Sequence, residues 1–263
     1  MLTTERFPQH WILTLDRPEK ANALSAELVE RLIDSFDEAQ ASGVPVVAFR
    51  GNGRNFSAGF DFDGFESQDE AHLLHRFVRI ETLLQAVYRA PCLTVALAHG
   101  RNFGAGADLF AACRWRVASP DASFRMPGLA FGLVLGTRRL AATVGRDCAR
   151  EMLESLQTVD APRAATIGLL RRIAPIDDWP RVLDEAIGAA QALDARSRAL
   201  LYQTLDDADH DADLAALVRS AAAPGLKERM RRYRQSQTSA GRAAGAVKSG
   251  VFDATFPSAA SAK

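Results

Sequence analysis

The amino-acid sequence predicts an α/β core followed by an all-helical C-terminal part. Short apolar segments typical of buried strands alternate with segments whose apolar residues recur at helical spacing, from residue 11 to about residue 175. After Trp179 only helical patterns remain, rich in alanine and leucine between Val182 and Leu205. The 263 residues, 48% apolar and 24% charged, have the composition of a soluble globular protein.

The first half of the core has four predicted elements. A short apolar strand covers 11–15. The helix that follows begins with Ser25 as its N-cap and ends before Gly43. A buried, β-branched strand covers 44–49, and a second, longer helix covers 69–89.

The second half of the core repeats the alternation. A buried strand at 92–97 leads into a glycine-rich turn, and a helix then runs through Leu109 to Cys113. A further short strand covers 115–118. Strand and helix patterns therefore continue to alternate, as an α/β core requires.

Charge and cysteine content exclude several classes of protein. Lys+Arg and Asp+Glu both number 32, and a chain without net charge is a poor candidate for non-specific binding to nucleic acid or to a membrane surface. Cys92, Cys113 and Cys148 are widely spaced, which supports neither a zinc ribbon nor a disulfide framework. We expect a cytoplasmic setting, with no signal peptide and no transmembrane helix, because no long apolar stretch occurs.

Four motifs that could carry chemistry have simpler interpretations. The glycines of 51–53 follow a strand, but the third glycine of a dinucleotide loop is missing. His72 and His75 share a helix face without partner ligands, which indicates an ordinary helix surface and no metal site. We expect the acidic residues of 206–213 to form a solvated loop, and the basic residues of 227–234 to form a solvated helix face.

Two turns rich in glycine and alanine follow buried strands, at 57–61 and at 104–108. Small residues let a ligand approach the backbone closely, and the second turn begins a helix, where N–H groups lack intrahelical partners. If the turns faced each other, two converging N–H donors would form an oxyanion hole, suited to a thioester carbonyl as it becomes an enolate. Spacing alone leaves open the alternative of two tightly packed turns without function.

Several segments resemble, in the right order, the motifs of the crotonase (enoyl-CoA hydratase/isomerase) superfamily. Each matches a separate motif, so the resemblance does not rest on any single one. They are the RPxKxNAL-like 17–24, the FxAGxD-like 55–61, the 90–108 segment with its glycine-rich turn, the AxFxxP-like 122–127 and the helical 160–169.

The resemblance implies a fold and a ligand. The fold would be a spiral of ββα turns with two roughly perpendicular sheets, which we place in residues 1–190. A helical region, 191–263, would build trimers or dimers of trimers. The ligand would be an acyl-CoA thioester, with no further cofactor and no metal.

The resemblance also implies roles for particular residues. The backbone N–H groups of Phe60 and Ala105 would form the oxyanion hole, and the backbone around Ala58 would meet the adenine. Lys20 and Lys248 would bind CoA. Phe60 and Ala105 replace the small residue and the glycine usual there, but the hole uses only backbone and can survive.

The largest departure concerns acid–base chemistry. The two glutamates of the family's hydratases correspond to Asp108 and Gly128, so one carboxylate is shortened and the other is absent. Hydration needs one group to activate water and one to deliver a proton. We therefore expect Asp108 to support a one-proton reaction, namely an isomerisation, a decarboxylation or a thioester hydrolysis. His75 and His99 are the other groups that could replace the missing glutamate.

The alternative is a catalytically silent acyl-CoA-binding protein or assembly subunit. The position of Asp108 separates the two hypotheses. A carboxyl group facing a pocket favours an enzyme, whereas a carboxyl group that caps its own helix favours the silent protein.

Overall fold

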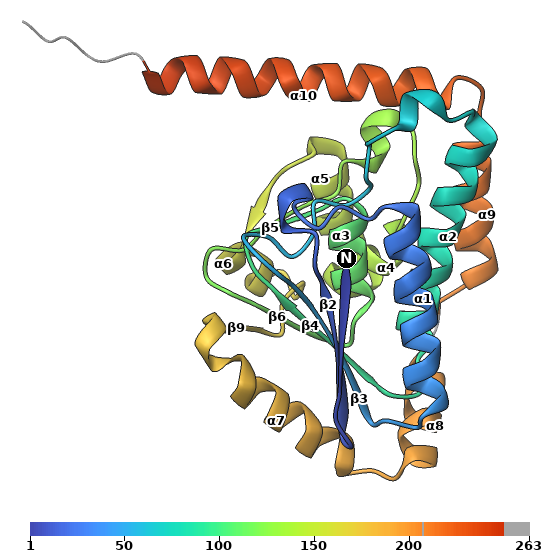
Figure 1. Ribbon diagram of the computed structural model, residues 1–263, viewed down its shortest axis with the longest axis vertical. Helices are drawn as coiled ribbons and strands as arrows, with labels where there is room; N and C mark the ends of the chain where they lie inside the picture. Colours follow the sequence, from blue (N-terminus) through green and yellow to red (C-terminus); the bar gives the residue numbers. More distant parts are fainter. Residues whose placement is uncertain (207, 250–263) are drawn as a thin grey trace, which may run out of the picture.

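The computed structural model describes residues 1–206 and 208–249, with side chains up to residue 239 (Figure 1). The side chain of Lys248 and the C-terminal residues from 250 onwards, for which we expect frayed chain, lie outside this description.

A six-stranded sheet forms the centre of the molecule. Its order is β1-β2-β3-β4-β6-β9, with β1 antiparallel to β2 and the other neighbours parallel. The strands are β1 (Leu2–Arg6), β2 (His10–Leu15), β3 (Val46–Gly51), β4 (Leu93–Ala98), β6 (Trp115–Ala118) and β9 (Arg172–Ile173). The sequence did not predict β1, because an edge strand buried only in part carries no apolar alternation.

Alternating side chains along the strands pack against helices on both faces of this sheet. In β3, Val46 and Ala48 pack toward α7 (Trp179–Gln191), whereas Val47 and Phe49 join the larger core on the other side. Helices α1 (Ala26–Ala41) and α2 (Glu70–Arg89) lie on that second side (Figure 1). The sheet is therefore buried on both faces, as its apolar runs require.

The helix starts expected from the sequence are confirmed by their caps. The N–H of Leu28 donates to Oγ of Ser25 over 3.2 Å at the start of α1. The N–H of His72 donates to Oδ1 of Asp69 over 2.8 Å at the start of α2. Both side chains satisfy N–H groups that the helix leaves without partners.

A second sheet and a set of short helices follow β4. The second sheet has the order β5-β7-β8, so the expected pair of sheets is confirmed. Its strands are β5 (Arg101–Phe103), β7 (Ser123–Arg125) and β8 (Val159–Asp160). The α-helices of this region are α3 (Ala105–Ala112), α4 (Thr137–Val144), α5 (Arg146–Ser155) and α6 (Ala161–Thr166). Short 3-10 helices are η1 (Pro18–Lys20), η2 (Phe65–Ser67), η3 (Gly128–Phe131) and η4 (Ile176–Asp178).

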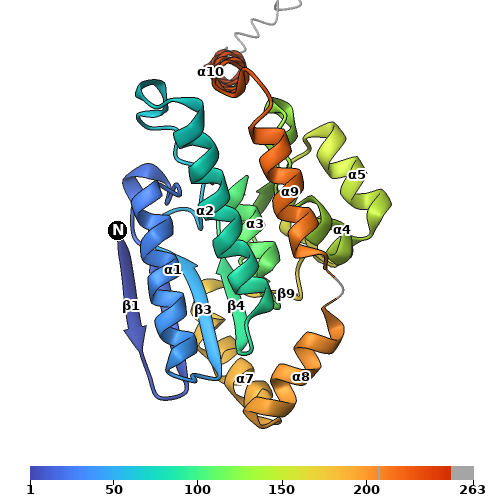
Figure 2. The same ribbon diagram turned by 90° about the vertical axis from the view of Figure 1, so that its right-hand side faces the viewer.

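Helices α8 (Ala195–Leu205), α9 (His210–Ala221) and α10 (Leu226–Ser249) form the C-terminal part. Figure 2 shows α9 beside α2, and Leu217 of α9 belongs to the larger core. Helix α10 projects beyond the body (Figure 1). The predicted boundary between 190 and 191 stays a prediction.

The expectation of a solvated loop at 206–213 is wrong in its second half. Helix α9 begins at His210, with Asp209 as N-cap. Asp213 is mostly buried and lies 3.2 Å from a guanidinium nitrogen of Arg138. Acidic side chains in the first turn of a helix are stabilised by the helix dipole, which is how Asp211 and Asp213 can be helical.

The sequence predicts that the described residues contain no transmembrane helix, no metal site and no disulfide framework. None of their helices combines the length and the apolar character needed to span a lipid bilayer. Within the same residues, no three His, Cys, Asp or Glu side chains are grouped as metal ligands. Cys92, Cys113 and Cys148 are free thiols.

Candidate active site

The two glycine-rich turns lie directly against each other. Gly59 has a φ of +86°, and a Cβ added to it would lie 2.4 Å from the carbonyl oxygen of Phe103 and 3.1 Å from the nitrogen of Ala105. A Cβ on Gly106 would lie 2.6 Å from the carbonyl oxygen of Ser57. Only glycine permits this approach, so the small residues of both turns have a steric reason.

The backbone N–H groups of Phe60 and Ala105 lie at this junction. On either side of Phe60, the carbonyl of Gly59 and the N–H of Asp61 bond to Leu24, while the N–H of Phe60 donates no hydrogen bond within the described residues. Ala105 opens α3, and its N–H has no partner there either. Two unpaired donors thus come from facing turns, the arrangement that the sequence predicted; their role as an oxyanion hole stays a prediction.

The opening segment 17–24 fixes the first turn. Asn22 is fully buried, and its Nδ2 donates to the carbonyl oxygens of Asn52 and Asn55, each over 2.8 Å. Nη1 of Arg17 donates to Oδ2 of Asp61 over 2.7 Å. The sequence motif gave Asn22 no role, and the structure assigns it a positioning one.

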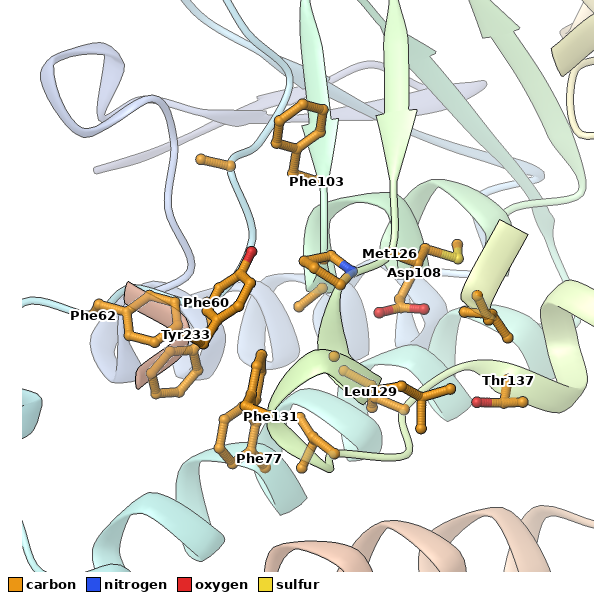
Figure 3. A pocket seen from close by; sticks show the side chains of 18 residues that line it. Phe60, Phe62, Phe77, Phe103, Asp108, Met126, Leu129, Phe131, Thr137 and Tyr233 are labelled. Atoms are coloured by element: carbon orange, nitrogen blue, oxygen red, sulfur yellow. The ribbon is translucent and has the colours of Figure 1, made fainter. Parts of the chain in front are cut away.

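A pocket opens in front of the two turns (Figure 3). Ala58, Phe60, Ala105, Asp108 and Gly128 all line it, so five of the positions singled out from the sequence meet in one place. Most of the other lining residues are apolar, and several are aromatic.

Three other predicted residues lie outside this pocket. Lys20 is exposed, and its Nζ lies 2.6 Å from Oδ2 of Asp63. His75 is exposed on α2 and borders a different cavity. His99 is buried and borders another cavity, and its Nε2 lies 2.8 Å from the carbonyl oxygen of Gly53. Neither histidine is placed to replace the missing glutamate.

Asp108 lies in the first turn of α3 and faces the pocket (Figure 3). Its residue is 4% exposed, and Oδ1 has no hydrogen-bond partner within the described residues, so the carboxyl group does not cap its helix. Burial raises the pKa of Asp108 to about 8. A carboxyl group that faces a pocket and does not cap its helix favours the enzyme hypothesis over the catalytically silent protein.

A buried ion pair behind the pocket acts on this carboxyl group. Nη1 of Arg139 on α4 donates to Oε1 of Glu81 on α2 over 2.9 Å, and both side chains are buried. Asp213 of α9 lies 3.6 Å from the same nitrogen. The Arg139 charge lowers the pKa of Asp108 and the Glu81 charge raises it, both by less than burial does. Sequence reasoning missed this pair, because its members are 58 positions apart and on different helices.

Gly128 supplies no acid–base group and little room for one. It opens η3, and a Cβ added to it would lie 3.0 Å from the carbonyl oxygen of Leu133. Asp108 is therefore the one carboxyl group among the described residues that line the pocket.

Comparisons with known proteins agree with this geometry. The sequence profile of the family described as enoyl-CoA hydratase/isomerase matches residues 11–249. A solved structure from Bordetella parapertussis, described as an enoyl-CoA hydratase/isomerase, is 59% identical and has a TM-score of 0.87 over 88% of this chain and 97% of its own. A Bacillus subtilis relative described as an enoyl-CoA hydratase is 33% identical over 201 residues, 74% of each chain. A mitochondrial Delta(3,5)-Delta(2,4)-dienoyl-CoA isomerase from Dictyostelium discoideum is 29% identical over 216 residues, 75% of this chain and 73% of its own.

Proposed function

The chain belongs to the enoyl-CoA hydratase/isomerase family, and from that premise we propose an acyl-CoA isomerase in which Asp108 moves one proton between carbon atoms. The observation that carries the proposal is that one carboxyl group, and no second one, lines the pocket within the described residues. An isomerase of the same family, from Dictyostelium, supports the choice of reaction.

The thioester would bind at the junction of the two turns. Its carbonyl oxygen would accept hydrogen bonds from the N–H groups of Phe60 and Ala105, which have no other partner in the described residues. The nucleotide end would lie toward Ala58, with Lys20 and Lys248 near the phosphates. Donors that are already in place stabilise the enolate charge as it develops, without reorganisation.

The raised pKa of Asp108 suits it to the removal of a proton from a carbon atom. As a carboxylate with a pKa of about 8, it is a stronger base than an ordinary aspartate, and its pKa lies near neutral pH. It would take a proton from one carbon as that C–H bond breaks and the double bond shifts. The O–H so formed would return the proton to another carbon, so that the carboxylate is regenerated and no atom is lost.

Hydration fits the site less well. Water addition needs a second acid–base group of the protein that acts on the substrate. The residue at the position of the second glutamate is Gly128, which has no such group. Decarboxylation and thioester hydrolysis can also proceed with one acid–base group on the enzyme, so they are the next reactions to assay.

The test compares the isomerisation of a 3-enoyl-CoA with the hydration of crotonyl-CoA. We expect isomerisation by the wild-type protein, a loss of about 100-fold or more in Asp108→Asn, and unchanged thioester affinity. Hydration with kcat above ~10 s⁻¹, or an isomerase unaffected by Asp108→Asn, would overturn the proposal. Binding without any turnover would support the silent acyl-CoA-binding protein instead.

The assembly is a separate proposal. Helix α8 exposes three leucines, Leu200, Leu201 and Leu205, the last at 70%, and exposed apolar side chains that gather on one element can mark an interface. We propose that the C-terminal helices build a threefold oligomer, as the family resemblance implies. Light scattering that reports a monomer at micromolar concentration would contradict this.

A further inference from the structure

One end of the pocket is a continuous wall of aromatic rings. Phe60, Phe62, Phe77, Phe131 and Tyr233 line it, and they come from the first turn and the residue after it, from α2, from η3 and from α10 (Figure 3). In the close-up these rings gather on one side of the pocket, and Asp108 lies on the other. The wall is therefore a distinct part of the site, separate from the group that would move the proton.

The rings hold one another in fixed positions. Phe60 stacks on Phe77 with centroids 4.5 Å apart and an interplanar angle of 24°. Phe62 meets Phe131 edge to face at 6.4 Å, and Tyr233 tilts against Phe131 at 5.2 Å. Offset, tilted and edge-to-face contacts are the geometries that aromatic pairs prefer. A further ring placed against this wall would find preformed faces and edges.

No cationic side chain lines the pocket within the described residues, although the Arg234 guanidinium lies over the Phe62 ring at 5.6 Å from outside the lining. Arg76 lies over the Phe60 ring at 4.1 Å, but it donates to the carbonyl oxygen of Asp61 and does not line the pocket. A negative charge on the acyl chain would be desolvated without a partner and would share the cavity with Asp108, which costs binding free energy.

Given the proposed function, we propose that the preferred substrates are acyl-CoA thioesters whose acyl group is uncharged and carries an aromatic ring. The ring lies against Phe62, Phe131 and Tyr233, while the thioester lies at the two turns. The absence of a cationic side chain among the described residues that line the pocket excludes acyl groups that end in a second carboxylate.

The test measures calorimetric affinities for saturated thioesters, which cannot isomerise. We expect 3-phenylpropanoyl-CoA to bind about tenfold more tightly than 3-cyclohexylpropanoyl-CoA, which has a ring of similar size without π electrons. We expect adipoyl-CoA, which carries a terminal carboxylate, to bind at least tenfold more weakly than hexanoyl-CoA.

Two variants locate the effect. Phe131→Leu removes one ring of the wall and should reduce the preference for phenyl over cyclohexyl several-fold. Phe7→Leu removes an exposed ring that stacks on His10 outside the pocket, and should leave the preference unchanged. Thermal melting of both variants checks that they fold.

The outcomes separate this inference from the proposed function. Equal affinities for the phenyl and cyclohexyl thioesters, or tighter binding of adipoyl-CoA, overturn the inference and leave the isomerase proposal standing. Failure of every thioester to bind overturns both.

Discussion

Oδ1 of Asp108 lies directly against the backbone of Gly136, so that a methyl group added to Gly136 would place its carbon 2.0 Å from that oxygen. Gly136 also has a φ of +65° and is the residue from which α4 starts. The position of the carboxyl group thus depends on the absence of a side chain at 136.

The Gly136→Ala variant should displace Asp108. We expect isomerase activity to fall at least tenfold and the free energy of unfolding to fall by about 1–3 kcal/mol, from the clash and the left-handed backbone. Gly145→Ala is the matched control, because Gly145 has a φ of +84° with no atom within 4 Å of its added Cβ. Gly145→Ala should lower the free energy of unfolding without lowering the isomerase activity. Full activity in Gly136→Ala would show that Asp108 has another position in which it works.

Replacing Asp108 should stabilise the protein at alkaline pH. The pKa of Asp108 is about 8 in the folded chain and near its ordinary value of 3.8 when unfolded, so the folded chain holds the proton more tightly. The stability of the wild-type protein then falls as the pH rises from about 4 to about 8. Asp108→Asn, which cannot ionise, should be more stable by about 5 kcal/mol at pH 8 and by about 3 kcal/mol at pH 6. Denaturant unfolding at both pH values measures this, and a gain independent of pH would contradict it.

The activity of the wild-type enzyme should depend on the same ionisation. Because the carboxylate takes the first proton, kcat/KM should rise with pH and level off above about 8. Arg139→Gln removes a charge that lowers the pKa of Asp108, so the rise should move to higher pH. A pH profile identical to that of the wild type would show that Arg139 has no influence on Asp108.

Stability measurements on the same pair provide the control. Arg139→Gln alone leaves Glu81 buried without its partner, and we expect a loss of about 3–5 kcal/mol. The double variant with Glu81→Gln should recover much of this loss, since neither residue then carries a charge. No recovery would mean that packing of the arginine, more than its charge, holds α2 and α4 together.

The exposed Lys20 tests the CoA site. Lys20→Ala should weaken acyl-CoA binding about tenfold without changing the melting temperature, because the ion pair of the lysine with Asp63 is exposed to solvent. Asp63→Ala, which frees the lysine, should not weaken binding. Calorimetry with butyryl-CoA measures both, and unchanged affinity in Lys20→Ala would remove this lysine from the site.

Local rules predicted most of the elements that surround the site. The strands at 92–97 and 115–118 and the helix after Ser25 appear in the structure within a residue or two of the predicted bounds. Buried parallel strands and helix N-caps can be predicted from residues that are neighbours in the sequence. The edge strand β1 lacks such a pattern because it is buried only in part, and the helix that begins in the acidic run is stabilised in addition by the contact of Asp213 with Arg138, 75 positions earlier.

The candidate site divides in the same way. The facing turns and the pocket position of Asp108 follow from glycines and from motif order, which are visible in the sequence. The Arg139–Glu81 pair and the contribution of Tyr233 depend on how α2, α4 and α10 meet in space. The sequence segment 227–234 indicated a solvated basic face, and gave no sign that the tyrosine within it lines the pocket.

The place of Tyr233 has a consequence for the order in which the protein matures. In chain order, the first ring of the wall is Phe60 and the last is Tyr233 of α10. The pocket therefore stays incomplete until residue 233 has left the ribosome. A nascent chain, or one cut before α10, would have its two turns but an open cavity. Acyl-CoA capture would therefore begin only after α10 has been synthesised and packed against the pocket, and it would report on completed folding of the site more faithfully than the appearance of the central sheet.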